Sequence, residues 1–222
     1  MDALAFKKLR KLTLTACVTA CMTAGFTLSV AVGVQAKTMA LPQQTRLDIL
    51  QKTVAYERLI HTFYEAFARG DAETMARCYH PEVRFEDPAF GVLKGKQASD
   101  MWRMLLSQAS DLEVRHKYVQ VQLMPDGVYR GQAHWDADYT FSLTGNKVNN
   151  QIDASFTFKD GLIYTHTDRF DTQRWASMAL GLPGVFFGGH DFFKNALQRT
   201  ARQRLEDFQA AAGSAEDPAR NP

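Results

Sequence analysis

Cysteine is scarce in this chain of 222 residues. Two of its three cysteines, Cys17 and Cys21, lie within the first 36 residues, so only Cys78 belongs to the remainder. One thiol can form neither an internal disulfide nor a cysteine metal cluster, which excludes a small scaffold held together by either. We expect Cys78 to be a small helix residue that faces the core.

The chain also lacks an excess of charge of one sign once its N-terminal segment is set aside. Of 26 Lys and Arg residues and 24 Asp and Glu residues, four basic residues and one acidic residue lie within residues 1–36. The remainder therefore has 22 basic and 23 acidic residues, a net charge of −1. Proteins that bind nucleic acids usually present a basic surplus, so we expect no nucleic-acid partner.

The first 36 residues have the order of regions found in export signals. A basic run at residues 7–11 precedes an uncharged stretch at residues 12–34, and the small residues Val34 and Ala36 offer a cleavage site. The uncharged stretch is longer than a usual signal core, so an uncleaved anchor in the inner membrane is the alternative. In either case we predict an exported, periplasmic domain that meets the membrane only through this segment.

Hydrophobic periodicity indicates helices first and antiparallel strands afterwards. Gly70 ends the first helix, Asp71 caps the second, and Asp160-Gly161 is a strong signal for a two-residue hairpin turn. The predicted helices cover residues 46–68, 71–79, 96–107, 175–180 and 191–211. The predicted strands cover residues 82–88, 112–124, 128–143, 147–159 and 162–171.

This order predicts an α+β fold. We expect a cone-shaped, curved antiparallel sheet, a half-barrel wrapped around the N-terminal helices, with an added C-terminal helix. The predicted parts are a signal peptide or anchor, a linker, the cone domain, a lid loop with a helix, and a disordered tail. Their ranges are residues 1–36, 37–45, 46–172, 173–211 and 212–222. The lid is the apolar, glycine-rich loop 181–189.

Asp87 is the first candidate for chemistry. It alternates with Val83 and Phe85, so a strand here places one carboxylate on an apolar face. Desolvation would raise the pKa of such a carboxyl group towards the range useful for proton transfer. The alternative is that Asp87, followed by Pro88, only caps a turn.

Three further sets of polar residues allow two interpretations each. His166 and Asp168 share one face of the last strand, and this face either lines a pocket or is exposed to solvent. A two-residue turn at the hairpin pairs Lys159 with Leu162 and places Asp153 opposite Asp168. His134, Asp136 and Asp138 resemble metal ligands, but a polar strand face is more often simply hydrated, so we expect no metal and no cofactor.

The sequence resembles the ketosteroid isomerase/SnoaL-like superfamily, also called the nuclear transport factor two-like superfamily. The resemblance rests on residues 63–71 (Phe-Tyr-Glu-Ala-Phe-Ala-Arg-Gly-Asp), Tyr79-His80-Pro81 through Glu86-Asp87-Pro88, and Lys94-Gly95-Lys96. It extends over residues 46–172 and implies a cone with an apolar pocket for a small hydrophobic molecule. Members include isomerases, polyketide cyclases, dehydratases and epoxide hydrolases, but also non-catalytic binding and transport domains. Relatives often form homodimers through the outer face of the sheet.

The resemblance assigns roles to particular residues. Asp87 stands where the isomerases have their general base, while their oxyanion-hole tyrosine falls on Phe63, one position from Tyr64. The second oxyanion aspartate falls on Ala154 or Asp153. His166 and Asp168 fall on strand positions that line the cavity in relatives. Asp168 is also similar to the acid of limonene-type epoxide hydrolases. The residues expected to line the pocket are Phe63, Tyr64, Phe85, Trp102, Trp135 and Phe170.

Two functions therefore follow from the sequence. The first is a cofactor-free isomerase, cyclase, dehydratase or epoxide hydrolase that works by carboxylate acid/base chemistry on Asp87, His166 and Asp168. The second is a non-catalytic periplasmic domain that binds a small molecule, or a dimeric interaction domain.

Overall fold

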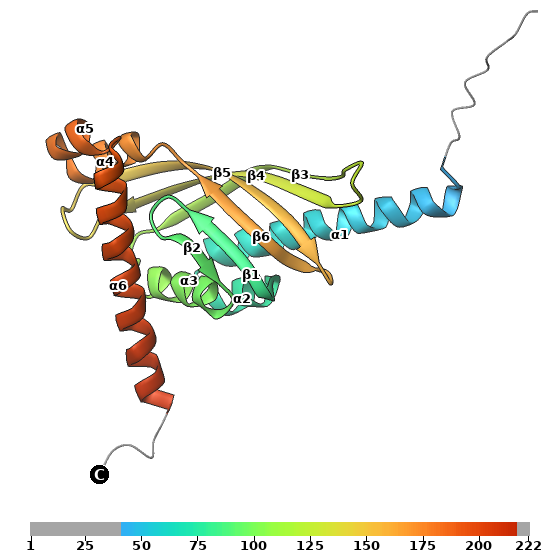
Figure 1. The fold of residues 1–222 in the computed structure, drawn as a ribbon, viewed down its shortest axis with the longest axis horizontal. Helices are drawn as coiled ribbons and strands as arrows, with labels where there is room; N and C mark the ends of the chain where they lie inside the picture. The colour runs from blue at the N-terminus through green and yellow to red at the C-terminus, as the bar shows by residue number, and fades with distance from the viewer. Residues whose placement is uncertain (1–40, 217–222) are drawn as a thin grey trace, which may run out of the picture. The chain divides into compact units, whose positions relative to one another are not determined.

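The computed structural model describes residues 41–216, and the export signal predicted for residues 1–36 lies outside them. The predicted helices and strands occur in the predicted order, and the structure adds one short strand and one short helix in segments expected to be loops (Figure 1). The helices are α1 (Gln43–Ala68), α2 (Ala72–Cys78), α3 (Lys96–Gln108), α4 (Thr172–Leu180), α5 (Leu182–Phe187) and α6 (Asp191–Glu216). The strands are β1 (Tyr79–Asp87), β2 (Gly91–Lys94), β3 (Glu113–Leu123), β4 (Tyr129–Thr140), β5 (Lys147–Lys159) and β6 (Leu162–Arg169).

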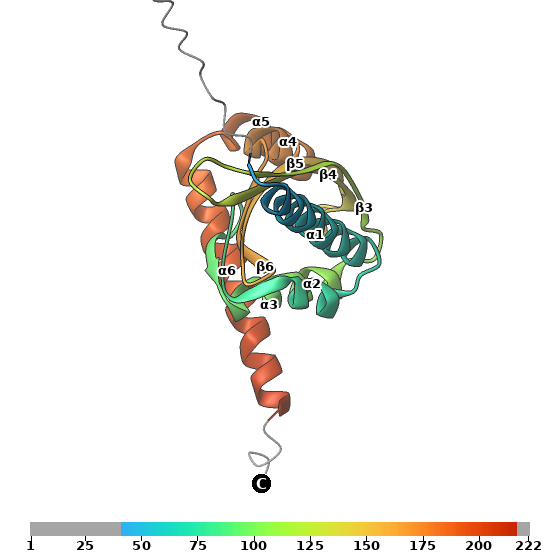
Figure 2. The same cartoon turned by 90° about the vertical axis from the view of Figure 1, so that its right-hand side faces the viewer.

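The six strands form one curved sheet in the order β2-β1-β6-β5-β4-β3. Figure 2 shows this sheet bending around α1, which confirms the predicted α+β cone. The sheet is not wholly antiparallel, because β1 and β6 pair in parallel. This pairing joins the strand that ends at Asp87 to the strand that carries Asp168.

Local sequence explains why these elements form. The Asp71 carboxylate accepts the backbone N–H of Thr74 at 2.9 Å and so caps α2. In β4, Ala133, Trp135 and Ala137 are buried while the residues between them are more exposed, as the alternation predicts. Cys78 is buried in the core, as expected from its helical position.

The hairpin between β5 and β6 differs from the prediction by one residue. Lys159 pairs with Leu162 as expected, and Asp160 and Gly161 have the positive φ angles of a two-residue turn. A bulge follows, because Thr157 pairs with Thr165 although Phe158 pairs with Ile163. Asp153 consequently lies opposite Arg169, and Ala154 lies opposite Asp168. The predicted pairing of Asp153 with Asp168 is wrong.

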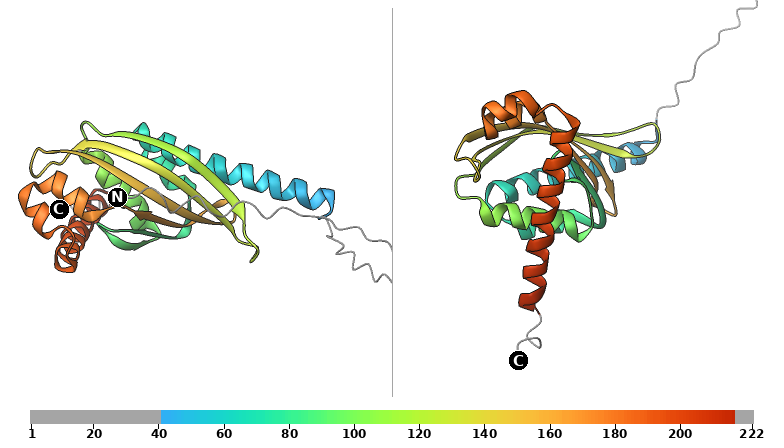
Figure 3. Two further views of the ribbon diagram at one scale, coloured as in Figure 1. Left: turned by 90° about the horizontal axis from the view of Figure 1, so that it is seen from above. Right: turned by 60° about the vertical axis from the view of Figure 1, so that its left-hand side comes forward.

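The C-terminal part is more helical than predicted. Residues 182–187 of the expected lid loop form α5. Helix α6 continues to Glu216, so the prediction of a disordered tail is wrong for residues 212–216. Side chains of α6, including Leu205 and Phe208, pack against the core of the cone, and α6 runs across its open end past α3 (Figures 1 and 3). No helix within residues 41–216 is long and apolar enough to cross a membrane.

Candidate functional site

A cavity of about 400 Å³ lies between α3, the inner face of the sheet and α6. Its wall is mostly apolar and aromatic, which suits a small hydrophobic molecule. Polar side chains of the sheet and of its turns interrupt this wall or its rim, among them Asp87, Asp111, Tyr139, Asn150 and Asp168. The residues of α6 that line the cavity are Leu197, Thr200, Ala201 and Arg204.

Asp87 lies at the end of β1, where it both faces the cavity and caps the following turn. Its Oδ1 accepts the backbone N–H of Phe90 at 2.6 Å. Burial raises the pKa of the Asp87 carboxyl group from 3.8 to about 7; hydrogen bonds from the turn oppose this rise, and the nearby Asp168 adds to it. The two interpretations of Asp87 are therefore compatible, because the capping bond does not offset the desolvation.

Asp168 lies beside Asp87 on the neighbouring parallel strand. Glu86 pairs with Thr167, so the next residue on each strand, Asp87 or Asp168, points to the inner face. Asp168 is only 4% exposed. Its Oδ1 accepts the indole N–H of Trp135 at 3.3 Å and lies 3.0 Å from Nε2 of His166. Two contacts on one oxygen fix the orientation of this carboxylate.

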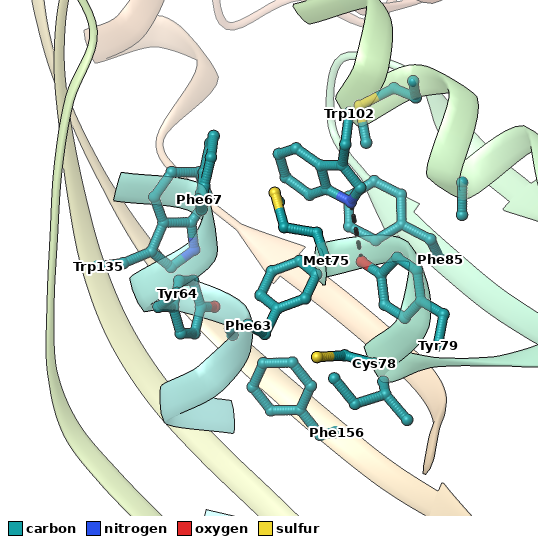
Figure 4. Close-up of a cluster of buried hydrophobic side chains, with 14 of the residues drawn as sticks. Phe63, Tyr64, Phe67, Met75, Cys78, Tyr79, Phe85, Trp102, Trp135 and Phe156 are labelled. Atoms are coloured by element: carbon teal, nitrogen blue, oxygen red, sulfur yellow. Dashed lines mark hydrogen bonds between the residues drawn. The ribbon is translucent and has the colours of Figure 1, made fainter. Parts of the chain in front are cut away.

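A chain of buried hydrogen bonds continues behind Asp168 into the core. The Trp102 indole N–H donates to the Tyr79 hydroxyl oxygen at 2.9 Å, a bond drawn in Figure 4, and the Tyr79 hydroxyl lies 2.8 Å from Nδ1 of His166. A carboxylate oxygen can only accept, so these contacts fit the His166 tautomer that carries its hydrogen on Nε2, with Nδ1 accepting from the Tyr79 hydroxyl group. Each hydrogen bond in this series, from Trp102 through Tyr79 and His166, is then donated in the direction of Asp168.

Four predicted site residues lie in the core and not at the cavity. His166 is fully buried, and its ring contacts those of Phe63 and Phe85 edge to face. Phe63 and Tyr64 on α1 belong to the aromatic cluster of Figure 4 and do not line the cavity. Their neighbours, including Trp102, Phe67 and Trp135, fill the space between them and the cavity. His166 therefore positions Asp168 and does not reach a ligand.

The other three predicted pocket residues, Trp102, Trp135 and Phe170, line the cavity together with Asp87 and Asp168. The expected lid residues 181–189 do not line it. Residues of α6 line the cavity instead, and none of them is among the pocket residues predicted from the sequence.

Asn150 is a cavity residue that the sequence analysis missed. It is the polar member of an otherwise apolar inward series on β5: Val148, Asn150, Ile152, Ala154 and Phe156. A polar residue at an inward position of a strand was the signal that pointed to it. By contrast, the side chain of Asp153 is 83% exposed and bonds to His134 on the outer face.

The outer face of the sheet carries paired charges and does not contribute to the cavity. Asp136 contacts His134 and Lys117, and Asp138 contacts Arg115. Within residues 41–216 no three His, Cys, Asp or Glu side chains gather in a way suited to a metal ion.

The curved sheet around N-terminal helices, with a cavity at its open end, defines the nuclear transport factor two-like class of α+β folds. More narrowly, residues 60–166 match the SnoaL-like domain family, and this chain carries a SnoaL-like domain. The elements after residue 166, including α4 to α6, lie beyond the matched segment.

Solved structures with similarity to the chain have low sequence identity. An LEH-like epoxide hydrolase from M. tuberculosis is 17% identical, with 61% of this chain and 97% of that chain covered and a TM-score of 0.47. TsrD from Streptomyces laurentii is 20% identical, with 58% of this chain and 97% of that chain covered and a TM-score of 0.46. A SnoaL-like protein from a Jannaschia species is 16% identical, with 59% of this chain and 94% of that chain covered and a TM-score of 0.48. The search of curated proteins gave no match.

Proposed function

We propose that this SnoaL-like domain is a cofactor-free enzyme that transfers protons to and from a small, largely apolar molecule held in the cavity. The observation that carries the proposal is Asp87, a carboxyl group at the cavity wall whose pKa is raised to about 7 by burial. An acid/base group is most effective when its pKa lies near the working pH, because both protonation states are then available.

The arrangement gives each carboxylate a separate task. Oδ1 of Asp87 is bonded to the turn, so Oδ2 takes the proton from the bound molecule and later returns one. Asp168 faces the same cavity with Oδ1 held by Trp135 and His166, which leaves Oδ2 to bind or orient the molecule. The apolar wall limits the water around both groups, which is the cause of the raised pKa at Asp87.

Proton exchange at carbon tests this proposal without knowledge of the natural substrate. The probe is 2-acetylnaphthalene in D₂O at pH 7, and the readout is the loss of its acetyl proton signal by NMR. Asp87 would take a proton from the carbon beside the carbonyl group and return a deuteron that it has received from solvent. We expect exchange above the buffer rate, reduced about a hundredfold by Asp87→Asn. Equal exchange with both proteins would overturn the proposal.

One observation favours a carrier without turnover as the second candidate. The Phe90 N–H bond gives Asp87 a structural task in the turn that does not require proton transfer. In a carrier, Asp87→Asn would keep ligand affinity within a few fold, because the amide oxygen still accepts the turn N–H and the amide still bonds to a ligand. Binding without any exchange that depends on Asp87 would identify this case.

A further inference from the structure

The polar part of the cavity wall extends beyond the two carboxylates, onto β4 and β5. Asn150 is only 8% exposed and lines the cavity, yet its side chain makes no hydrogen bond with any residue in the described range 41–216. A buried polar side chain that faces a cavity is explained if a ligand supplies its partner.

Tyr139 lies next to Asn150 on the same inner face. Ala137 pairs with Asn150 and Tyr139 with Val148, so Tyr139 and Asn150 are diagonal neighbours across two antiparallel strands. Diagonal neighbours are within reach of long and aromatic side chains. Both residues line the cavity.

The hydroxyl group of Tyr139 is oriented by a residue outside the segment that matches the SnoaL-like family. The indole N–H of Trp175, on α4, donates to the Tyr139 hydroxyl oxygen at 2.8 Å. With this lone pair occupied, the hydroxyl hydrogen is free to donate to another group. Burial is the main cause that raises the pKa of Tyr139, with the nearby Asp87 carboxylate adding to the rise, so the phenol keeps its hydrogen at neutral pH.

The charges around the cavity limit the kind of oxygen that this pair would bind. Asp87 and Asp168 face the same space, which disfavours an anionic ligand. The basic side chain among the lining residues, Arg204, is exposed on α6. Two neutral donors, an amide N–H and a phenol O–H, suit the two lone pairs of one neutral carbonyl oxygen.

We propose that Asn150 and Tyr139 form a binding site for the carbonyl oxygen of a neutral, apolar ligand, and that Trp175 positions Tyr139 for this task. The proposal rests on the proposed function only in that the ligand is the one presented to Asp87. Helix α4 then helps to determine which ligands the cavity accepts, because it carries Trp175.

Binding of two matched probes tests this site. 2-Acetylnaphthalene carries the carbonyl group, and 2-ethylnaphthalene has the same ring system without the oxygen. Trp102, Trp135 and Trp175 are the three tryptophans of the chain and all line the cavity, so quenching of tryptophan fluorescence reports binding there. The infrared stretching frequency of a ¹³C-labelled carbonyl reports its hydrogen bonds directly.

We expect the intact protein to bind the ketone at least tenfold more tightly than the hydrocarbon, and to lower the carbonyl frequency relative to an apolar solvent. Asn150→Leu and Tyr139→Phe should each weaken ketone binding about tenfold and return the frequency partly to its unbonded value, with hydrocarbon binding unchanged. Trp175→Phe should shift the frequency in the same direction but less, because it acts through Tyr139. The controls are Gln151→Leu, exposed on the other face of β5, and Tyr129→Phe on β4, which does not line the cavity.

Equal affinity of the intact protein for the two probes, including no detectable binding of either, would overturn the proposal. So would a carbonyl frequency that is the same in the intact protein and in both variants. Asp87→Asn separates this proposal from the proposed function, because it should reduce proton exchange about a hundredfold but leave ketone affinity within a few fold. If exchange does not depend on Asp87 but the carbonyl site binds as described, only the proposed function fails. If exchange depends on Asp87 but Asn150 and Tyr139 do not affect the carbonyl group, only this proposal fails.

Discussion

At the scale of single residues, a carboxyl group with a raised pKa makes the stability of the fold depend on pH. Asp87 holds its proton up to about pH 7 in the folded chain, whereas an unfolded chain releases it near the ordinary value of 3.8. Between these two values the folded state binds more protons, so the free energy of unfolding falls as pH rises. The stability cost is complete above pH 7 and absent below about pH 4.

Asp87→Asn should therefore stabilise the protein at pH 8 and not at pH 4. The amide keeps an oxygen for the Phe90 N–H and removes the buried charge, so the expected gain at pH 8 is a few kcal/mol. Urea unfolding at both pH values measures it. A difference between the two proteins that does not change with pH would show that Asp87 is not desolvated as described.

Tyr79 is the residue whose loss tests the buried chain of hydrogen bonds. Tyr79→Phe removes the hydroxyl group that accepts from Trp102 and contacts His166, which leaves two buried polar groups without partners. We expect a loss of about 1–3 kcal/mol in the free energy of unfolding. Tyr129→Phe, whose hydroxyl group has no hydrogen bond within residues 41–216, serves as the control in the same urea titration. If both substitutions lowered the free energy of unfolding by the same small amount, the buried hydrogen bonds of Tyr79 would be contradicted.

At the scale of elements, α6 is bonded to the turn that carries Asp87. Arg202 donates to the backbone oxygens of Phe90 and Val92 at 2.9 and 3.1 Å, and Gln198 donates to that of Pro88 at 3.1 Å. Gly91, whose φ angle is +70°, leaves room for the guanidinium group of Arg202, since a Cβ atom there would lie 3.0 Å from Nη2 of that group. Helix α6 thus lines the cavity and also holds the turn that follows Asp87.

Arg202→Ala should release α6 and the β1–β2 turn together. Loss of hydrogen bonds from a charged donor, worth about 1.5–3 kcal/mol in total, should speed local amide exchange in both segments by roughly ten- to a hundredfold. Hydrogen–deuterium exchange with mass spectrometry measures both segments at once. Gln203→Ala, on the exposed side of α6, is the matched control. Faster exchange in α6 with an unchanged turn would mean that the bonds do not support Asp87.

The sequence predicted the elements well because their signals are local. Asp71 at the start of α2, the alternation in β4 and the turn at Asp160-Gly161 each act over a few residues. The bulge at Tyr164 is not local in this sense. It sets the register between β5 and β6. Because Tyr164 is an extra residue, Ile163 on one side of the bulge and His166 and Asp168 on the other all point inwards.

The cavity was less predictable than the fold, because its wall depends on which large side chains fill the space first. Phe63 and Phe85 point inwards as expected, but they pack into the aromatic core, which leaves Trp102 and Trp135 to face the cavity. The contribution of α6 depends on contacts such as that of Gln198 with Pro88, 110 residues apart in the chain. No pattern within α6 itself encodes this contact.

At the scale of the whole molecule, the described domain of residues 41–216 follows a segment with the order of an export signal. We expect a chain expressed with its own N-terminus to leave the cytoplasm and to begin mostly at Lys37. N-terminal sequencing of the periplasmic fraction measures this, with a chain lacking residues 2–36 as the control. An intact Met1 on protein in the soluble cytoplasmic fraction would contradict export. The pairing of two copies through the outer face of the sheet also stays a prediction.

The most direct measurement is the titration of the Asp87 carboxyl carbon by ¹³C NMR, assigned by comparison with Asp87→Asn. The proposed function is carried by the desolvation of Asp87 at the cavity wall, which raises the pKa of its carboxyl group to about 7. We predict a midpoint near pH 7 in the free protein. A midpoint near 3.8 would show that Asp87 is a solvated turn residue, and the proton-transfer function would be contradicted.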